Sequence, residues 1–148
     1  MAASFVHLNV HSEYSIVDGI VRIKPLIQAV SQQAMNAVAL TDEMNLFAAV
    51  KFYKTAVAQK IKPIMGADIY LSDQNIFASR AFRTTVLCQN QIGYHNLTCL
   101  ISRAYLEGQK KGKPVVDWSW LAELNEGLII LSGAGQGEIG YGLMNESK

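Results

Sequence analysis

The chain has 148 residues, of which 50% are apolar, and its formal net charge is +1. This length suits one domain, and the apolar share is enough to build a hydrophobic core. The nearly neutral charge gives no basic surplus of the kind that would indicate nucleic-acid binding by this chain alone.

Targeting and membrane signals are absent from the sequence pattern. The first residues, MAASFVHLNV, lack the basic segment and the long apolar run of a signal peptide. No apolar run approaches the roughly 20 residues of a membrane span. Cys88 and Cys99 are too few for a disulfide framework or a zinc ribbon, and their apolar neighbours predict buried free thiols. We therefore expect a cytoplasmic protein with no membrane partner.

Residues 5–10, FVHLNV, predict the first strand because branched apolar residues dominate them. The strand period of two puts His7, Asn9 and His11 on one face and the intervening apolar residues on the other. We expect the apolar face to lie under helices and the polar face to line an interior or a mouth. His7 is expected to be partly buried.

Two helices and two strands are predicted next along the chain. Residues 24–35 form the first helix, and residues 37–42 form the second strand. The apolar face of that helix would consist of Ile27, Val30 and Ala34. Residues 45–60 predict a helix that Asn45 can cap, followed by a strand over 61–71. The apolar stripe of this second helix would consist of Leu46, Val50, Tyr53 and Val57.

The second half of the chain begins with a link over 72–82 that has no long helix, which predicts a hairpin-like turn. A strand is predicted over 83–89 and a helix over 93–108. The buried face of this helix would consist of Leu97, Leu100, Ile101 and Ala104, with Gly108 ending it.

The last elements are shorter. Asp117 is predicted to cap a helix over 117–124, and residues 128–133 predict the fifth strand. The glycine-rich run 133–142 lacks the Gly-Lys-Ser/Thr ending of a phosphate loop, so it predicts a flexible loop before a last helix.

Alternation of strands and helices predicts largely parallel pairing with right-handed crossovers. Five such strands fit either an open doubly wound sheet or part of a (β/α) barrel. In both folds chemistry gathers at the carboxyl ends of the strands. Those ends carry several polar side chains, too many of them acidic for a plain core. They are His11, Ser12, Asp42, Glu43, Asp68 and Asn90.

Five segments, in this order and at these spacings, resemble one known family. They are FVHLNVHSEYSIVDG, ALTDEMNLFAAVKFY, IKPIMGADIY, GYHNL and LNEGLIILSG. Together they resemble the PHP (polymerase and histidinol phosphatase) domain at the N-terminus of bacterial DNA polymerase III alpha subunits. The resemblance implies a partial, distorted (β/α) barrel with about five mainly parallel strands, the first part of a PHP-type (β/α)₇ barrel.

The resemblance also implies that residues 1–148 are the N-terminal part of a truncated PHP domain. The palm, fingers and thumb of the polymerase would be absent. A barrel cut after its fifth strand exposes an unpaired edge, so self-association of the fragment is an expectation.

Metal-bearing members of the family carry ligands that this sequence has replaced. Their His-x-His motif corresponds to Asn9 and His11, and the histidine of their Thr-Asp-His-Gly-Asn motif corresponds to Glu43. Asp18 is kept, and Asp68 stands where they have a glutamate. Two more positions differ, because Arg83 matches a histidine and Ala134 matches a cysteine.

These replacements predict an emptied metal site with no cofactor, although weak Mg²⁺ binding by the carboxylates stays possible. In its place we expect a structural polar network in which Arg83 stands in for the metal and pairs with Asp68, or with Glu43. The remaining members are Asn9, His11, Asp18 and Asp42. Asp42 is also expected to brace the turn into the second helix.

The resemblance implies a non-catalytic module of the replicative polymerase that supports the polymerase core and docks the proofreading exonuclease (epsilon) subunit. Its partners would be the rest of the alpha subunit and that exonuclease, with DNA reached only through the full enzyme. The alternative is a metal-dependent phosphoesterase or 3′–5′ exonuclease of the same family. An unrelated small α/β enzyme is disfavoured because no nucleophile–base pair or cofactor motif is visible.

Overall fold

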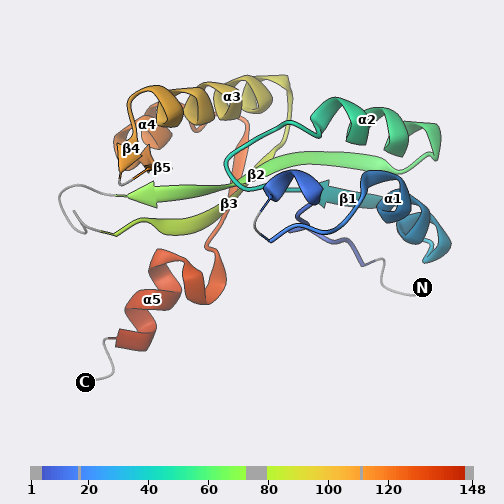
Figure 1. Ribbon diagram of the computed structural model, residues 1–148, viewed down its shortest axis with the longest axis horizontal. Helices are drawn as coiled ribbons and strands as arrows, with labels where there is room; N and C mark the ends of the chain where they lie inside the picture. Colours follow the sequence, from blue (N-terminus) through green and yellow to red (C-terminus); the bar gives the residue numbers. More distant parts are fainter. Residues whose placement is uncertain (1–4, 17, 73–79, 111, 146–148) are drawn as a thin grey trace. The chain divides into compact units, whose positions relative to one another are not determined.

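The computed structural model describes residues 5–16, 18–72, 80–110 and 112–145 (Figure 1). The chain divides into two compact units, Met1–Ala67 and Asp68–Lys148, which are described separately. Among the residues that the structure describes, no helix is long and apolar enough to cross a membrane.

Unit 1 is built around two parallel strands. Its elements are the 3₁₀ turn η1 (Glu13–Ser15), helix α1 (Ile23–Gln32), strand β1 (Ala37–Leu40), helix α2 (Ala49–Ala58) and the first part of strand β2 (Lys62–Ser72). β1 pairs with β2 from Ala37 opposite Lys62 to Leu40 opposite Met65. The predicted strand–helix–strand crossover is therefore present in this unit.

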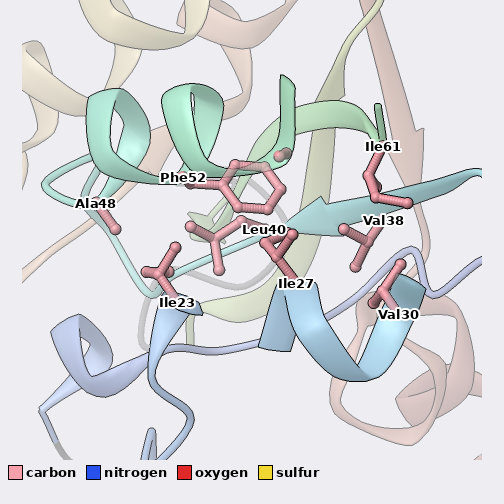
Figure 2. Packing of buried hydrophobic residues seen from close by; sticks show 9 residues of the cluster. Ile23, Ile27, Val30, Val38, Leu40, Ala48, Phe52 and Ile61 are labelled. Atoms are coloured by element: carbon pink, nitrogen blue, oxygen red, sulfur yellow. The ribbon is translucent and has the colours of Figure 1, made fainter. Parts of the chain in front are cut away.

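The core of unit 1 is formed by α1, β1 and α2 (Figure 2). Phe52 of α2 lies close to Leu40 of β1, and Ile27 of α1 lies on the other side of Leu40. All three side chains are at least nine-tenths buried. Burial of a large apolar side chain of this kind contributes about 1.5–3 kcal/mol.

Helix α2 buries a different face from the one that the sequence indicated. The helix begins at Ala49, and its buried residues are Ala49, Phe52 and Ala56. The predicted stripe is largely exposed, with Val50 at 65%, Tyr53 at 54% and Val57 at 49%. The buried face therefore presents one large side chain, Phe52, between two small ones. The prediction was wrong because apolar residues recur at helical spacing on both faces of α2, so spacing alone cannot tell which face is buried.

Residues 5–10 do not form a regular strand, which corrects the sequence analysis. The segment is bonded to β1 and to the residue that follows it, from Ala39 N to His7 O at 2.8 Å and from Thr41 N to Val10 O at 2.9 Å. Val10 N donates instead to the hydroxyl of Thr41, so the backbone hydrogen bonds do not continue as they would between two paired strands. His7 is exposed rather than partly buried.

Unit 2 contains the rest of β2 and the remaining elements. They are β3 (Phe82–Cys88), α3 (Gln91–Leu106), β4 (Gln109–Lys110), β5 (Lys113–Pro114), β6 (Val116–Asp117), α4 (Trp118–Glu123), β7 (Leu128–Leu131), η2 (Ala134–Gln136) and α5 (Glu138–Asn145). The strand order is β1-β2-β3-β7, with β6 also paired to β2. The molecule is thus a mixed α/β protein with a five-stranded sheet. The turn predicted over 72–82 falls mostly outside the described residues.

The sheet is less parallel than the sequence indicated. β2 and β6 pair in parallel, whereas β3 and β7 are antiparallel, with Cys88 opposite Leu128. Gln89 N donates to Gly127 O at 2.8 Å, so β7 begins beside the end of β3 and runs back along it. Gly127 has a φ of +71°, and a Cβ there would lie 2.4 Å from Asn90 Oδ1, so this turn requires glycine.

The helices of unit 2 follow the sequence pattern closely. Asn90 caps α3 by accepting a hydrogen bond from Gly93 N, and the predicted apolar face is buried. Asp117 caps α4 through Ser119 N, as predicted. The run 133–142 is not a loop throughout, because α5 begins at Glu138.

Cys88 and Cys99 are half-buried rather than buried. Burial raises the pKa of the Cys88 thiol from 9.0 to about 11, because the thiolate is disfavoured away from water. Since the folded state holds this proton more tightly, Cys88 contributes stability that is lost as the pH rises from about 9 towards 11.

We expect native Cys88 to react with iodoacetamide about 100-fold more slowly at pH 8 than it does in the urea-unfolded chain. The thiolate is the nucleophile, and a pKa raised by about two units lowers its fraction by about that factor. Mass spectrometry of the Cys88 peptide over time measures both rates. Equal rates in the folded and unfolded chain would contradict this account.

Candidate functional site

The residues singled out by the sequence fall into two groups, one in each unit. Unit 1 holds Asn9, His11, Asp18, Asp42 and Glu43, and unit 2 holds Asp68, Arg83 and Ala134.

Asp42 follows β1 directly and is almost fully buried, with an exposed fraction of 2%. Its Oδ1 accepts hydrogen bonds from Ser12 N at 2.6 Å and from Ser15 Oγ at 2.8 Å. Its Oδ2 accepts from Ser12 Oγ at 2.7 Å. Both oxygens of the carboxylate are therefore used to hold the segment that contains η1.

The turn towards α2 is held by other side chains, which corrects two predictions. Asn45 Nδ2 donates to Tyr14 O and to Glu43 O, and its Oδ1 accepts from Phe47 N. Asn45 therefore stabilises this turn but does not cap α2, whose N-cap Ala48 makes no side-chain hydrogen bond. Asp42 binds η1 rather than the turn into the helix.

Ser15 links the two segments and was missed by sequence reasoning. Its hydroxyl donates to Asp42 and accepts from Glu43 N at 3.1 Å. A serine that follows a predicted strand carries no periodic signal. The available clue was its place among the polar residues after His11 in HSEYS.

His11 is paired with a carboxylate in unit 1. Its Nδ1 lies 2.8 Å from Asp18 Oδ1, with the side chain of His11 9% exposed and that of Asp18 42% exposed. Asn9 is exposed and Glu43 is half-buried. The His11–Asp18 contact is therefore direct.

In unit 2, Arg83 contacts Asp68, the pair that the sequence analysis anticipated. Arg83 Nε donates to Asp68 Oδ2 at 2.7 Å, and Thr85 Oγ1 donates to Oδ1 at 2.6 Å. The Asp68 side chain is 2% exposed and that of Arg83 is 20% exposed. Arg83 Nη1 also lies 3.4 Å from Gln136 Oε1, a neighbour that the sequence did not indicate.

The contacts of Asp68 join β2 to β3, and Arg83 extends them to η2. Arg83 and Thr85 project from β3 onto Asp68 of β2, and Gln136 belongs to η2. Ala134 opens η2 with a φ of 48° and carries no ligand atom in its side chain.

Comparison with known proteins identifies the family of the chain. The model of the PHP domain matches residues 7–148. The chain belongs to the PHP domain family. The resemblance found in the sequence is thereby confirmed.

The relatives of this PHP domain are much longer proteins. The chain is 51% identical over 144 residues to DNA polymerase III subunit alpha of Pseudomonas fluorescens, covering 97% of the chain and 12% of that relative. It is 45% identical over 140 residues to the same subunit of Escherichia coli K12, covering 95% of the chain and 12% of the relative. The chain therefore spans about one eighth of the length of the curated relatives that it matches.

Two solved structures share the fold at low identity. One, from Bifidobacterium adolescentis and described as a metal-dependent phosphoesterase, has a TM-score of 0.52 at 11% identity, covering 69% of this chain and 33% of that one. The other, an amidohydrolase from Chromobacterium violaceum, has a TM-score of 0.52 at 17% identity, covering 67% and 32%. These likenesses concern the fold alone.

The residues of this PHP domain do not fit a catalytic metal centre. The oxygens of Asp42 and Asp68 already accept hydrogen bonds from buried donors, and a metal would have to displace them. The described part of the chain holds no group of three or more His, Cys, Asp or Glu residues placed to bind one ion. Arg83 adds a fixed positive charge that opposes a cation at Asp68.

Proposed function

We propose that this PHP domain is a non-catalytic module of a bacterial DNA polymerase III alpha subunit and acts in DNA replication. The identities of 45–51% to alpha subunits support this assignment. DNA-directed DNA polymerase activity, a nucleotidyl transfer, would reside in the parts of the alpha subunit that this chain does not cover. The PHP domain would pack against the rest of the alpha subunit and would reach DNA only through it.

The observation that carries the proposal is the ion pair between Arg83 and Asp68. A guanidinium cannot act as a metal ligand and does not lose its proton in proteins. Placed 2.7 Å from a buried carboxylate, it neutralises the charge that a metal would otherwise balance. Two separate sets of polar residues would then stabilise their own units instead of catalysing hydrolysis: Asn9, His11, Asp18 and Asp42 in unit 1, and Asp68 and Arg83 in unit 2.

We also propose that the sheet is the first part of a distorted (β/α)₇ barrel, with residues 1–148 forming the N-terminal part of the domain. The parallel β1–β2 and β2–β6 pairs and the likeness to the two solved structures support this architecture. Ile129 and Ile130 of β7 are 43% and 41% exposed, and later strands would cover them. We propose further that the proofreading exonuclease subunit docks on this domain and that the protein is cytoplasmic.

The competing function is hydrolysis of phosphate esters or of DNA 3′ ends with a bound metal. It is favoured by the metal-dependent phosphoesterase that shares the fold. It is opposed by the hydrogen bonds that occupy Asp42 and Asp68 and by the charge of Arg83. Weak binding of Mg²⁺ to carboxylates would not by itself supply a hydrolytic centre.

We expect no hydrolysis above background when the chain is assayed with Mn²⁺, Zn²⁺ or Mg²⁺. Suitable substrates are p-nitrophenyl phosphate and a 3′-labelled DNA oligonucleotide. The matched control is His11→Ala, which removes the imidazole retained from the His-x-His motif. Metal-dependent turnover that disappears in His11→Ala would overturn the proposal.

A further inference from the structure

Helix α2 carries a row of exposed apolar side chains away from its buried face. Val50, Tyr53 and Val57 are exposed on the helix, and Phe47, in the turn that leads into it, is 71% exposed. Phe52 points from the other side of the helix into the core of unit 1 (Figure 2). Side chains spaced by three or four residues are neighbours on a helix surface. The four exposed side chains therefore form one row, which we call the α2 stripe.

The α2 stripe lies in a basic stretch of the chain. Residues 44–67 contain four lysines and no aspartate or glutamate. Lys51 and Lys54 belong to α2 and Lys60 follows it, and all three are exposed. Lys51 Nζ lies 3.5 Å from Glu13 Oε1, so this face already attracts a carboxylate. Among the residues that the structure describes, Lys54 and Lys60 form no ion pair, which leaves their charge available to a partner.

We propose that the α2 stripe binds an amphipathic helix of another polypeptide. The apolar face of that helix meets the stripe, and carboxylates at its rim pair with Lys54 and Lys60. Apolar surface rimmed by charged side chains is typical of protein-binding sites. The inference goes beyond the proposed function, because it involves none of the residues that replace metal ligands and holds whether or not the domain hydrolyses phosphate esters.

A helix suits this surface better than an extended segment does. Side chains at three- and four-residue spacing form ridges that pack into the grooves of a second helix, at about 8–10 Å between the two axes. An extended segment would bind through backbone hydrogen bonds to a free sheet edge. The backbone groups of a helix are bonded to one another, so α2 offers no such edge.

Two other occupants fit the charges less well. In a symmetric dimer the same patch occurs on both subunits, so the stripe of one copy would bring Lys54 and Lys60 against the same lysines of the other. Like charges placed together oppose such a contact. An anionic membrane would require stronger anchoring than two lysines and a row of four side chains supply. The lysines and the apolar row together favour an acidic amphipathic helix.

Fluorescence anisotropy with a designed peptide tests the surface. The probe is a fluorescein-labelled peptide of about 15 residues, long enough to form a helix, with leucines along one face and glutamates elsewhere. One control peptide has lysines in place of the glutamates, and another has the composition of the probe in an order that gives no apolar face. We expect the probe to bind the chain at least about tenfold more tightly than either control peptide.

Two pairs of substitutions locate the binding on the stripe. Val50→Ser combined with Val57→Ser should weaken binding of the probe at least about tenfold, because the centre of the apolar contact is lost. Lys54→Glu combined with Lys60→Glu should weaken it at least about fivefold and reverse the preference between the glutamate and lysine peptides.

Matched substitutions elsewhere serve as controls. Ile92→Ser changes an isoleucine on α3 that is 49% exposed, the same fraction as Val57. Lys24→Glu reverses an exposed charge on α1. Both should leave the affinity for the probe unchanged, and circular dichroism checks the fold of every variant.

The proposal is overturned if the chain does not bind the probe, if the three peptides bind equally, or if the double serine variant keeps its affinity. Sedimentation and flotation with vesicles of phosphatidylglycerol and phosphatidylcholine examine the other two occupants. A dimer that the double serine variant dissociates would assign the stripe to a second copy of the chain. Vesicle binding that this variant loses would assign it to a membrane, and either result would reject the proposal.

Discussion

Replacement of Arg83 by alanine is expected to lower the free energy of unfolding by about 3 kcal/mol. Removal of one partner from a buried ion pair typically costs about 3–5 kcal/mol, because the other charge is left without a counter-ion. Asp68 is 2% exposed, so water cannot replace the guanidinium easily. We expect the lower end of that range because Arg83 is itself 20% exposed and Thr85 still donates to Asp68.

Urea denaturation followed by circular dichroism measures this change. Arg22→Ala is the control, since Arg22 is 78% exposed and lies 3.8 Å from Glu13. An exposed pair of that kind contributes at most about 1 kcal/mol. Asp68→Asn in the Arg83→Ala background should recover part of the loss by removing the unpaired charge. A near-neutral Arg83→Ala, or a double variant less stable than the single one, would show that the pair does not stabilise unit 2.

The helices of unit 2 were predicted well because their apolar residues recur at helical spacing and because Asp117 is the cap expected for α4. That Asn90 caps α3 was not predicted. Asn90 and Asp117 each accept a backbone N–H at the start of a helix, and short polar side chains are favoured there for that reason. In α2 the pattern was misleading, because Val50, Tyr53 and Val57 lie on the exposed face. The buried face consists of Phe52 with two small residues, Ala49 and Ala56, so counting large apolar side chains selects the wrong side.

The direction of β7 could not be read from its own residues. Residues 128–131, LIIL, are equally compatible with a parallel or an antiparallel strand. The direction is set by the contact of Gln89 with Gly127, which joins two turns far apart in the sequence. A tertiary contact of this kind leaves no local pattern.

Of the candidate site, the sequence predicted the ion pair of Arg83 but not the hydrogen bonds of Asp42. An arginine at a position that resembles a metal ligand predicts a carboxylate partner. The sequence left Asp68 and Glu43 open, and the structure shows the contact with Asp68. The role of Asp42 was misplaced because serines can donate from many positions. Its donors, Ser12 and Ser15, come from a segment about 30 residues earlier in the chain.

Asp42→Ala is expected to lower the free energy of unfolding by at least about 3 kcal/mol. Hydrogen bonds to a charged group contribute about 1.5–3 kcal/mol each, and the losses do not simply add. Ser12 N, Ser12 Oγ and Ser15 Oγ would all lose their acceptor. The two hydroxyls can rotate towards other partners, but the backbone N–H of the fully buried Ser12 cannot, so its desolvation is left uncompensated.

Three further variants separate this role from a general effect of removing charge. Asp18→Ala is the matched control, because that carboxylate is 42% exposed, whereas Asp42 is 2% exposed. It should cost less than about 1 kcal/mol, in the range of exposed pairs.

Asp42→Asn keeps one acceptor oxygen for Ser12 N, so its free energy of unfolding should fall between that of Asp42→Ala and that of the native chain. Ser15→Ala combined with Asp42→Ala should cost less than the sum of the two single changes, since both remove the same hydrogen bond. Denaturation curves in which Asp18→Ala is as destabilising as Asp42→Ala, or in which the serine and aspartate changes are fully additive, would show that Asp42 does not hold η1 through these contacts.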